Sequence, residues 1–265
     1  MTKNFKLLLK EAREIGLTTD IIYPEKEVVE ISDGSRKIIV KEVFSFANDP
    51  ESSSAVLAKN KEITYRLWER EDVPFPRSRY FRNNSSFPKD ATELGLKFPL
   101  VFKKSNGKKS IGIRTNIGSF QELKGIVADS EGSFIIQEMV FGREYRLLIF
   151  KDRLLGALEL VPPQITGDGT NTIATLIQKK NSDLQKKIII NEKVMQTLEK
   201  SGLSLNSVPE NGVHVSLQEN SCLAEGGSSI DRTDVVHQDM LQLAQKAAYA
   251  VNMKLAGIDI ICEDI

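Results

Sequence analysis

The chain has 265 residues, of which 40% are hydrophobic and 27% are charged. A globular chain of this length can form one large lobe or about two to three small ones. Lysine plus arginine and aspartate plus glutamate both number 36, so the net charge is zero. This balance argues against a protein that binds nucleic acid or a membrane with its whole surface.

The reactive residue types are sparse. The two cysteines are Cys222 and Cys262, the two histidines are His214 and His237, and none of them has zinc-site spacing. The N-terminal stretch MTKNFKLLLKEAREIG is amphipathic, contains acidic residues and lacks a long apolar core, so it predicts neither a signal peptide nor a membrane span. We therefore expect a soluble, cytoplasmic protein in a reducing compartment.

The first part of the chain predicts a small α/β lobe. Apolar residues at helical spacing predict a helix over Asn4–Ile15, which Gly16 ends. Strand and hairpin signals follow at Asp20–Tyr23, Val28–Ile31, Asp33–Gly34 and Lys37–Val43. A second helix is expected over Ser52–Arg70, ended by the prolines beyond Val73. Lys61 lies within this helix and, on its own, is typical of a solvated surface charge.

A basic glycine loop follows the next predicted strand. We expect a helix over Pro88–Leu96, a strand over Pro99–Lys103 and a return strand over Ile111–Ile117. The loop between the two strands contains Gly107 and several lysines, which would suit a flap over phosphate. It is not a P-loop, and a solvated hairpin tip explains the same residues.

Two apolar strands with a charged joint are expected over Phe134–Phe150. The joint carries five polar or charged side chains, namely Gln137, Glu138, Arg143, Glu144 and Arg146. From this stretch alone, a hairpin with a solvated loop and a functional hinge are both open. Just upstream, Ser119 and Glu122 form a capping box for a helix that ends near Ala128.

The rest of the chain alternates strands, turns and helices. In order we expect a strand over Arg153–Val161, a rigid turn at Pro162–Gly169, a short helix over Thr172–Lys180, a basic helix with a solvated face over Gln185–Lys200, a strand over Gly212–Leu217, a flexible anion-capable loop at Glu225–Ser229, a helix over Val235–Val251 and a strand over Leu255–Cys262. That last strand carries one carboxylate, Asp259, in an apolar run. Burial of a lone carboxylate is costly, so a metal ligand is favoured over a satisfied structural aspartate.

Several short segments occur together in a fixed order. They are Pro99–Lys103, Gly142–Arg146, Ile165–Gly169 with Thr172–Ile173, Leu176–Ile177 and Asn181, Gly226–Gly227 with Ile230–Asp234 and His237, and Ala256–Ile260. From Lys59 onward this order resembles the ATP-grasp superfamily. The sequences of the segments are similar to those of the ATP-binding domains of cyanophycin synthetases and of the glutathione-synthetase half of bifunctional glutathione enzymes.

The resemblance implies an α+β, ATP-grasp fold. It implies an N-terminal α/β lobe over 1–58 and an ATP-grasp domain over 59–265, with a middle lobe at about 77–137, a C-terminal lobe at about 138–265, and ATP clasped between these last two. It also implies roles for individual residues. Lys61, Lys103 and the Gly107 flap would contact the phosphates, and Gln137, Glu138, Met139 and Val140 would line the adenine, with backbone groups of Glu138 and Val140 facing its edge.

Further roles follow from the same resemblance. Glu144 would hold the ribose hydroxyls, because a carboxylate accepts two hydrogen bonds from a diol. Arg146 would face the transferred phosphate, and Asp259 would bind Mg²⁺. The loop containing Gly226, Gly227, Asp231 and Asp234 would close on an amino-acid or peptide substrate.

The implied activity is that of an ATP-dependent carboxylate–amine ligase working through an acyl phosphate. The family adds a Glu-x-Asn metal motif one strand later, whereas the sequence given stops at Ile265, so we expect a truncated C-terminus. A non-catalytic ATP-binding or regulatory remnant is therefore the alternative. An unrelated α/β domain fits poorly, because the segments occur in the family's order. The identity of the acid and amine is open, as is the oligomeric state, with a homodimer among the alternatives.

Overall fold

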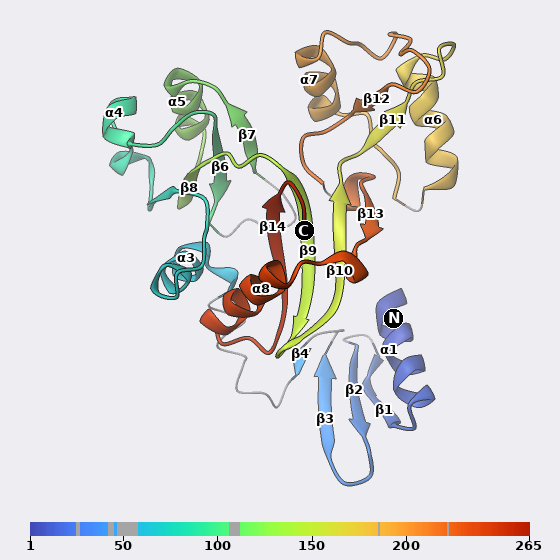
Figure 1. The fold of residues 1–265 in the computed structure, drawn as a ribbon. Helices are drawn as coiled ribbons and strands as arrows, with labels where there is room; N and C mark the ends of the chain where they lie inside the picture. Colours follow the sequence, from blue (N-terminus) through green and yellow to red (C-terminus); the bar gives the residue numbers. More distant parts are fainter. Residues whose placement is uncertain (25–26, 42–44, 47–57, 106–111, 185, 222) are drawn as a thin grey trace. The chain divides into compact units, whose positions relative to one another are not determined.

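The structure is a computed structural model that describes residues 1–24, 27–41, 45–46, 58–105, 112–184, 186–221 and 223–265 (Figure 1). The chain divides into two compact units, Met1–Lys59 and Asn60–Ile265. No helix in the described ranges is both long and apolar enough to span a bilayer.

The first unit is a helix on a small antiparallel sheet. Helix α1 (Lys3–Glu14) buries Phe5, Leu9 and Ala12 against Val29, Ile31 and Val40. The sheet order is β1-β2-β3-β4, formed by β1 (Thr18–Tyr23), β2 (Val28–Ser32), β3 (Lys37–Lys41) and β4 (Ser45–Phe46). This unit therefore combines a helix with an antiparallel sheet.

Helix α3 (Lys61–Arg70) opens the second unit. Asn60 caps it, with Oδ1 accepting from the amides of Glu62 at 3.0 Å and Ile63 at 3.3 Å. The predicted continuous helix over Ser52–Arg70 is therefore wrong at Asn60, since asparagine there satisfies the free amides of a new helix. Residues 52–57 of that prediction lie outside the described ranges. Lys61 is consequently the first helical residue, not an interior one.

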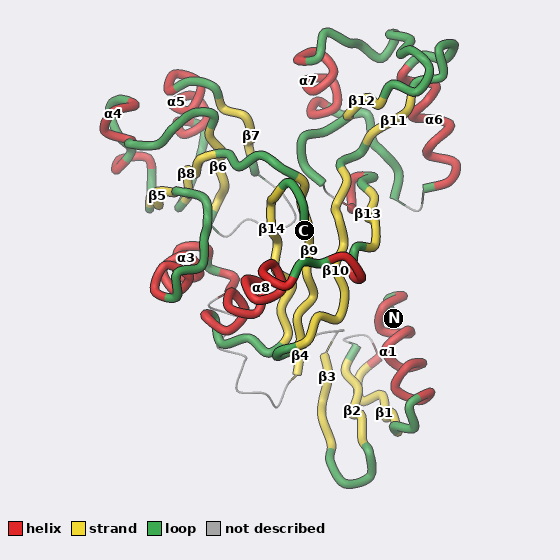
Figure 2. Tube along the Cα trace, in the orientation of Figure 1, coloured by secondary structure: helices red, strands yellow, loops and turns green. Residues whose placement is uncertain are grey.

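The middle sheet has the antiparallel order β5-β8-β6-β7. Its strands are β5 (Ser78–Phe81), β6 (Leu100–Lys104), β7 (Arg114–Ile117) and β8 (Phe134–Glu138). One face packs against helices α4 (Ala91–Leu94) and α5 (Phe120–Ala128), whose Leu94, Leu123 and Val127 are buried with Leu100 and Phe134 (Figure 2). The turn η2 (Asn84–Ser86) precedes α4.

The N-cap residues of α5 and α4 test two predicted helix starts. Ser119 Oγ accepts from the Glu122 amide at 3.2 Å, and Glu122 reaches back to the Gly118 amide at 3.0 Å, so the predicted helix start is confirmed. The helix expected from Pro88 instead begins after Asp90, whose Oδ1 accepts from the Glu93 amide at 2.8 Å.

The large sheet has the antiparallel order β13-β10-β9-β14. Its strands are β9 (Arg143–Phe150), β10 (Arg153–Val161), β13 (Ser228–Asp231) and β14 (Leu255–Cys262). Helix α8 (Gln238–Ala250) covers one face, and its small Ala244, Ala247 and Ala248 pack against residues of the strands such as Tyr145 and Leu147. The turns η3 (Leu223–Glu225) and η4 (Thr233–Val235) flank β13.

A smaller substructure lies between β10 and β13 in the chain. It contains β11 (Gln164–Thr166), β12 (His214–Ser216), α6 (Ile173–Asp183) and α7 (Glu192–Lys200), and has its own apolar core that includes Ile173, Ile188, Val194 and Leu198. Here three predictions were wrong in part. Strand β11 occupies the expected turn at 162–169, helix α7 begins only after Asn191, and strand β13 replaces part of the expected flexible loop. Ile188 is buried in the region expected to be a solvated helix face.

Candidate functional site

The stretch Phe134–Phe150 connects two sheets. Strand β8 pairs with β5 and β6, whereas β9 pairs with β10 and β14. The hairpin alternative is therefore wrong, because the two strands never pair with each other. Residues Met139–Gly142 form the connection, whereas the side chains expected in a charged joint lie within the strands, Gln137 and Glu138 in β8 and Arg143, Glu144 and Arg146 in β9.

Strand β9 presents its side chains alternately to the core and to the opposite face. Tyr145, Leu147 and Ile149 are buried in the core with α8. Because successive strand residues point to opposite sides, Glu144 and Arg146 lie on the face away from α8. In the sheet register Arg146 is opposite Asp259 of β14 and Leu158 of β10, which is itself opposite Asp231 of β13. One row across the sheet thus carries an arginine and two carboxylates.

Arg146 and Asp259 form a bidentate ion pair. Arg146 Nε donates to Asp259 Oδ1 at 2.6 Å, and an Nη donates to Oδ2 at 2.9 Å. The two side chains are 49% and 50% exposed, so the expectation of a buried Asp259 is wrong. The outward-facing position on β14 explains the exposure. The ion pair satisfies the carboxylate as the structural alternative required, and metal binding by Asp259 stays a prediction.

Lys103, near the end of β6, lies within electrostatic range of this row. Burial lowers the pKa of Lys103, as does repulsion from Lys61, while attraction from Glu144 and Asp259 partly offsets both effects. Burial also lowers the pKa of Lys61. The structure therefore brings together two desolvated ammonium groups, a situation that a bound anion would relieve.

Glu144 shows the opposite shift. Burial and the neighbouring Asp259 raise the pKa of Glu144, against hydrogen bonding from Ser221 and the charges of Arg146 and Lys103. Hydrogen bonding to Asp259 raises the pKa of Arg146 despite partial burial. Of the predicted site residues, five are thus electrostatically coupled: Lys61, Lys103, Glu144, Arg146 and Asp259.

The predicted adenine segment is partly engaged by the protein itself. The Glu138 amide donates to the Arg77 carbonyl at 2.8 Å and the Met139 amide to the Pro99 carbonyl at 3.0 Å. The Glu138 amide is therefore already engaged. The predicted backbone contact of Glu138 with the adenine edge would have to use its carbonyl. Gln137 is only 5% exposed and accepts from the Tyr65 hydroxyl at 3.4 Å, whereas Val140 is 39% exposed. Gly107 lies outside the described residues.

The predicted substrate loop is more ordered than expected. Gly226 has φ +94° and packs closely on Ile188, where an added Cβ would lie 2.5 Å from a side-chain carbon. Asp231 accepts from the Thr233 amide and hydroxyl, which lower its pKa. Asp234 lies in η4 and is exposed, and Gly227 lies directly before β13.

Glu225 has a counter-ion. Lys193 of α7 donates to both of its carboxylate oxygens, at 3.0 and 3.2 Å. An unpaired Glu225 would add negative charge to the loop that is expected to close on the substrate. Because Lys193 pairs with it, the net charge at this point is balanced.

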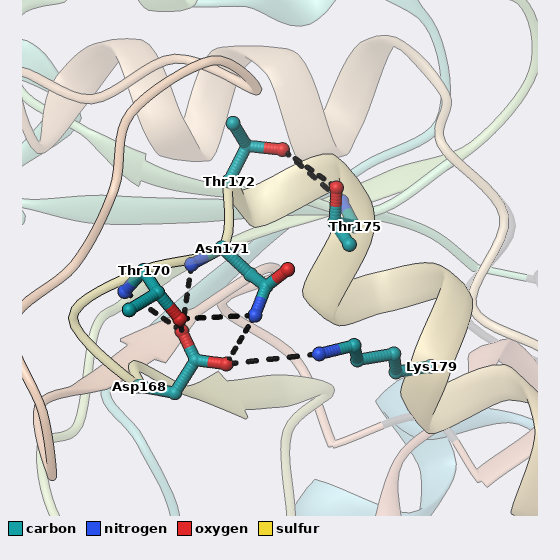
Figure 3. A network of polar contacts seen from close by, with 6 residues as sticks. All are labelled: Asp168, Thr170, Asn171, Thr172, Thr175 and Lys179. Carbon is teal, nitrogen blue, oxygen red and sulfur yellow. Dashed lines mark hydrogen bonds and ion pairs between the residues drawn. The ribbon is translucent and has the colours of Figure 1, made fainter.

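Asp168, in the Gly167–Gly169 motif, stabilises the local turn through the hydrogen bonds shown in Figure 3. Its carboxylate accepts from the amides of Thr170 and Asn171 and from both of their side chains, at 2.6 to 3.1 Å, and Lys179 lies 3.8 Å away. These donors hold the pKa of Asp168 far below its usual value. The motif therefore closes the turn before α6, where Thr172 caps the helix.

Sequence reasoning missed two acidic side chains on the strands and loops of the site region. Glu159 of β10 is buried and paired with Arg232, with 2.8 Å between Arg232 Nε and Glu159 Oε2. A lone glutamate in the apolar run Leu158–Val161 was the available signal. Glu219 hydrogen-bonds to Thr115 of β7 at 2.5 Å, and nothing local in the sequence connects residues so far apart.

The donor set fits a magnesium ion that is carried by phosphates. Within the described residues no group of three acidic, histidine or cysteine side chains is placed to hold a metal alone. Mg²⁺ is commonly held by one or two carboxylates together with substrate phosphates. Two of the lone-pair sites of Asp259 remain after its ion pair with Arg146, and Glu144 lies nearby.

Gly142 offers a direct test of the hinge geometry. It has φ +142°, and an added Cβ would lie 2.7 Å from the Cys262 carbonyl oxygen. We expect Gly142→Ala to lower the free energy of unfolding by about 1–3 kcal/mol, through backbone strain and displacement of β14. Denaturant titration measures this, with Gly118→Ala as the control, because no atom lies within 4 Å of a Cβ there. Equal stability of the two variants would contradict the close approach.

Sequence comparison gives relatives that cover much of this chain. It is 27% identical over 274 residues to the glutathione biosynthesis bifunctional protein of Clostridium perfringens, covering 98% of this chain and 35% of the relative. It is 32% identical over 221 residues to the cyanophycin synthetase of Trichormus variabilis, covering 79% of this chain and 24% of the relative. The chain thus spans about a quarter to a third of the length of these relatives. No protein-family model matches it.

Structure comparison agrees on the fold. The bifunctional glutathione synthetase from Pasteurella multocida superimposes with a TM-score of 0.69 at 24% identity, over 98% of this chain and 37% of that one. The D-alanine–D-alanine ligase from Bacillus anthracis gives a TM-score of 0.50 at 14% identity, over 80% of this chain and 55% of that one. These matches confirm the predicted α+β architecture.

Proposed function

Since this chain has the ATP-grasp fold and is related in sequence to ATP-grasp ligases, we propose that it is an ATP-dependent carboxylate–amine ligase. The observation that carries the proposal is that Lys103 interacts electrostatically with Lys61, Glu144 and Asp259, while Arg146 forms a bidentate ion pair with Asp259 and interacts with Glu144. Lys103 comes from the middle sheet, and Glu144, Arg146 and Asp259 come from the large sheet. Cations from one sheet facing carboxylates of another are suited to a phosphate chain with its metal.

The two lysines would hold the phosphates of ATP. Burial and mutual repulsion lower the pKa of Lys103, and burial lowers the pKa of Lys61, so each ammonium group gains from a nearby anion. Lys61 is the first residue of α3, where the helix dipole adds a further positive contribution. The part of the flap that contains Gly107 would add backbone amides to the same phosphates.

The connection Met139–Gly142 and the start of β9 would hold the nucleoside. The carbonyl of Glu138 and the backbone of Val140 would face the adenine edge, with Gln137 and Met139 beside them. Glu144 would accept hydrogen bonds from the ribose hydroxyls. Asp259 would hold Mg²⁺ through the phosphates, and the ion would neutralise charge on the phosphate oxygens.

The reaction joins an acid and an amine. A carboxylate oxygen of the first substrate attacks the γ-phosphorus, ADP leaves, and an acyl phosphate forms; the amine then attacks the acyl carbon, loses a proton, and inorganic phosphate leaves. Arg146 would stabilise charge on the transferred group with its guanidinium. Gly226, Gly227, Asp231 and Asp234 would border an amino acid or short peptide.

A phosphate-release screen tests the proposal. With Mg-ATP and a panel of amino acids and dipeptides, we expect ADP and phosphate to form only with particular acid–amine pairs, together with a new amide detected by mass spectrometry. If the full-length protein formed ADP no faster than the background rate with every acid–amine pair, the ligase proposal would be wrong. Omission of Mg²⁺ is the control and is expected to remove the signal.

A non-catalytic ATP-binding module is the second candidate. The favouring observation is that Arg146 engages both oxygens of Asp259, while no three-residue metal cluster exists among the described residues. The same screen separates the two candidates. A module would bind Mg-ATP, as a rise in melting temperature reveals, but would form no ADP with any pair.

A further inference from the structure

Strand β7 (Arg114–Ile117) lies at the edge of the middle sheet, next to the strand that carries Lys103. Its register with β6 places Leu100 opposite Ile117 and Phe102 opposite Arg114. Strand β7 is therefore paired directly with β6, the strand that contains Lys103. A contact that restrains β7 also restrains the backbone of β6 at this lysine.

Glu219 holds β7 from outside the middle sheet. One of its carboxylate oxygens accepts from Thr115 Oγ at 2.5 Å, and the other accepts from Lys200 Nζ of α7 at 3.0 Å. Asn116, which has φ +54°, also helps to lower the pKa of Glu219. One carboxylate thus joins the edge of the middle sheet to α7, with side-chain exposures of 27% for Glu219 and 55% for Lys200.

The same short segment reaches the face of the large sheet. Ser221, two residues beyond Glu219, lies close enough to Glu144 to lower the pKa of that carboxyl. The segment Glu219–Ser221 thus bonds to the edge of the middle sheet and approaches the large sheet, in addition to the covalent connection Met139–Gly142. A hinge restrains the distance between two bodies but leaves their closure angle free, whereas a second contact restrains the angle.

We propose that Glu219 is a positioning residue, which through Thr115 holds β7 and β6 so that Lys103 stays opposite Glu144 and Asp259. This inference rests on the proposed function, because it assigns Glu219 to the same nucleotide site. Glu219 does not touch the nucleotide in this proposal. It acts through the two strands.

Hydrogen exchange without nucleotide tests the contact directly. In Thr115→Val and in Glu219→Ala we expect the 114–117 amides to exchange about fivefold to tenfold faster, as befits loss of a charged hydrogen bond, while those of β5 are unchanged. Glu219→Gln, which retains an acceptor for Thr115, is expected to be intermediate. Thr197→Val is the matched control, since its hydroxyl donates only to the Lys193 carbonyl within α7. Exchange as in wild type in the first two variants would overturn the proposal.

Nucleotide affinity tests the positioning. We expect Thr115→Val and Glu219→Ala each to weaken Mg-ATP binding about fivefold to tenfold by calorimetry, with the double variant no weaker than either single one. Faster exchange with unaltered affinity would overturn the positioning of Lys103. Absence of Mg-ATP binding by the wild type would overturn the proposed function, and the positioning role with it, while the exchange data would still decide whether Glu219 holds β7.

Discussion

Replacing Lys103 with alanine is expected to abolish the rise in melting temperature that Mg-ATP gives the wild-type chain. Lys103 is half-buried, and its pKa is lowered by burial and by Lys61, so the free protein holds a poorly solvated cation that a phosphate would stabilise. A charge-assisted contact in such surroundings is worth about 1.5–3 kcal/mol, or roughly tenfold to a hundredfold in affinity. Thermal shift and calorimetry with Mg-ATP measure the loss.

The adjacent lysine provides the control. Lys104 follows Lys103 in β6, points to the other side of the strand and is exposed. Lys104→Ala changes the net charge by the same amount and is expected to retain the shift. Without nucleotide, Lys103→Ala is expected to be at least as stable as wild type, because the change removes a desolvated charge. A full Mg-ATP shift in Lys103→Ala would remove this residue from the phosphate site.

Arg146→Lys is expected to lower the turnover number by about a hundredfold or more, with Mg-ATP affinity changed only a few-fold. A lysine keeps the charge but cannot reproduce the planar bidentate contact with Asp259 or present two parallel donors to an oxyanion. The turnover number and KM are measured with an acid–amine pair found by the phosphate-release screen. Loss in the turnover number, rather than in KM, identifies a contact made during group transfer.

A second arginine on the same strand is the matched control. Arg143 lies three residues earlier in β9 and is exposed. Arg143→Lys is expected to leave turnover within about twofold, as is usual for an exposed surface substitution. If Arg146→Lys instead retained turnover and lost Mg-ATP affinity, Arg146 would belong to nucleotide binding alone and the catalytic assignment would be wrong.

Local sequence signals predicted most of the elements that place the site. The apolar run after Arg146 predicts a strand there, but β9 begins at Arg143, and the burial of Tyr145, Leu147 and Ile149 in the structure places Glu144 and Arg146 on the outward face. The helix start at Ser119 could also be predicted locally, because a hydroxyl and a carboxylate three residues apart satisfy free backbone amides at a helix N-terminus. The helix starts at Asn60 and Asn191 were not predicted. Each asparagine lies inside a longer amphipathic pattern, and that pattern predicts one continuous helix through it.

Long-range register lies beyond local signals. Arg146 faces Asp259 because β14 pairs with β9 across more than a hundred residues of chain, and no spacing rule reports that pairing. The same holds for Thr115 with Glu219 and for Lys193 with Glu225. A strand with an apolar run is often covered on both faces, which would bury Asp259; among the described residues, α8 covers one face of β14, and Asp259 on the other face is 50% exposed.

From Glu144 to Ile149, strand β9 alternates between two environments: Tyr145, Leu147 and Ile149 are buried in the core with α8, and the residues between them lie on the opposite face. Insertion of a single residue within it would exchange the two sets, turning Glu144 and Arg146 inward and Leu147 outward. The connection Met139–Gly142 is bound by no such alternation, although Gly142 itself is confined by Cys262. Length variation among natural or laboratory variants should therefore be tolerated around Val140 and Phe141 and eliminated a few residues later, a pattern that insertion scanning of the gene would display as a sharp boundary.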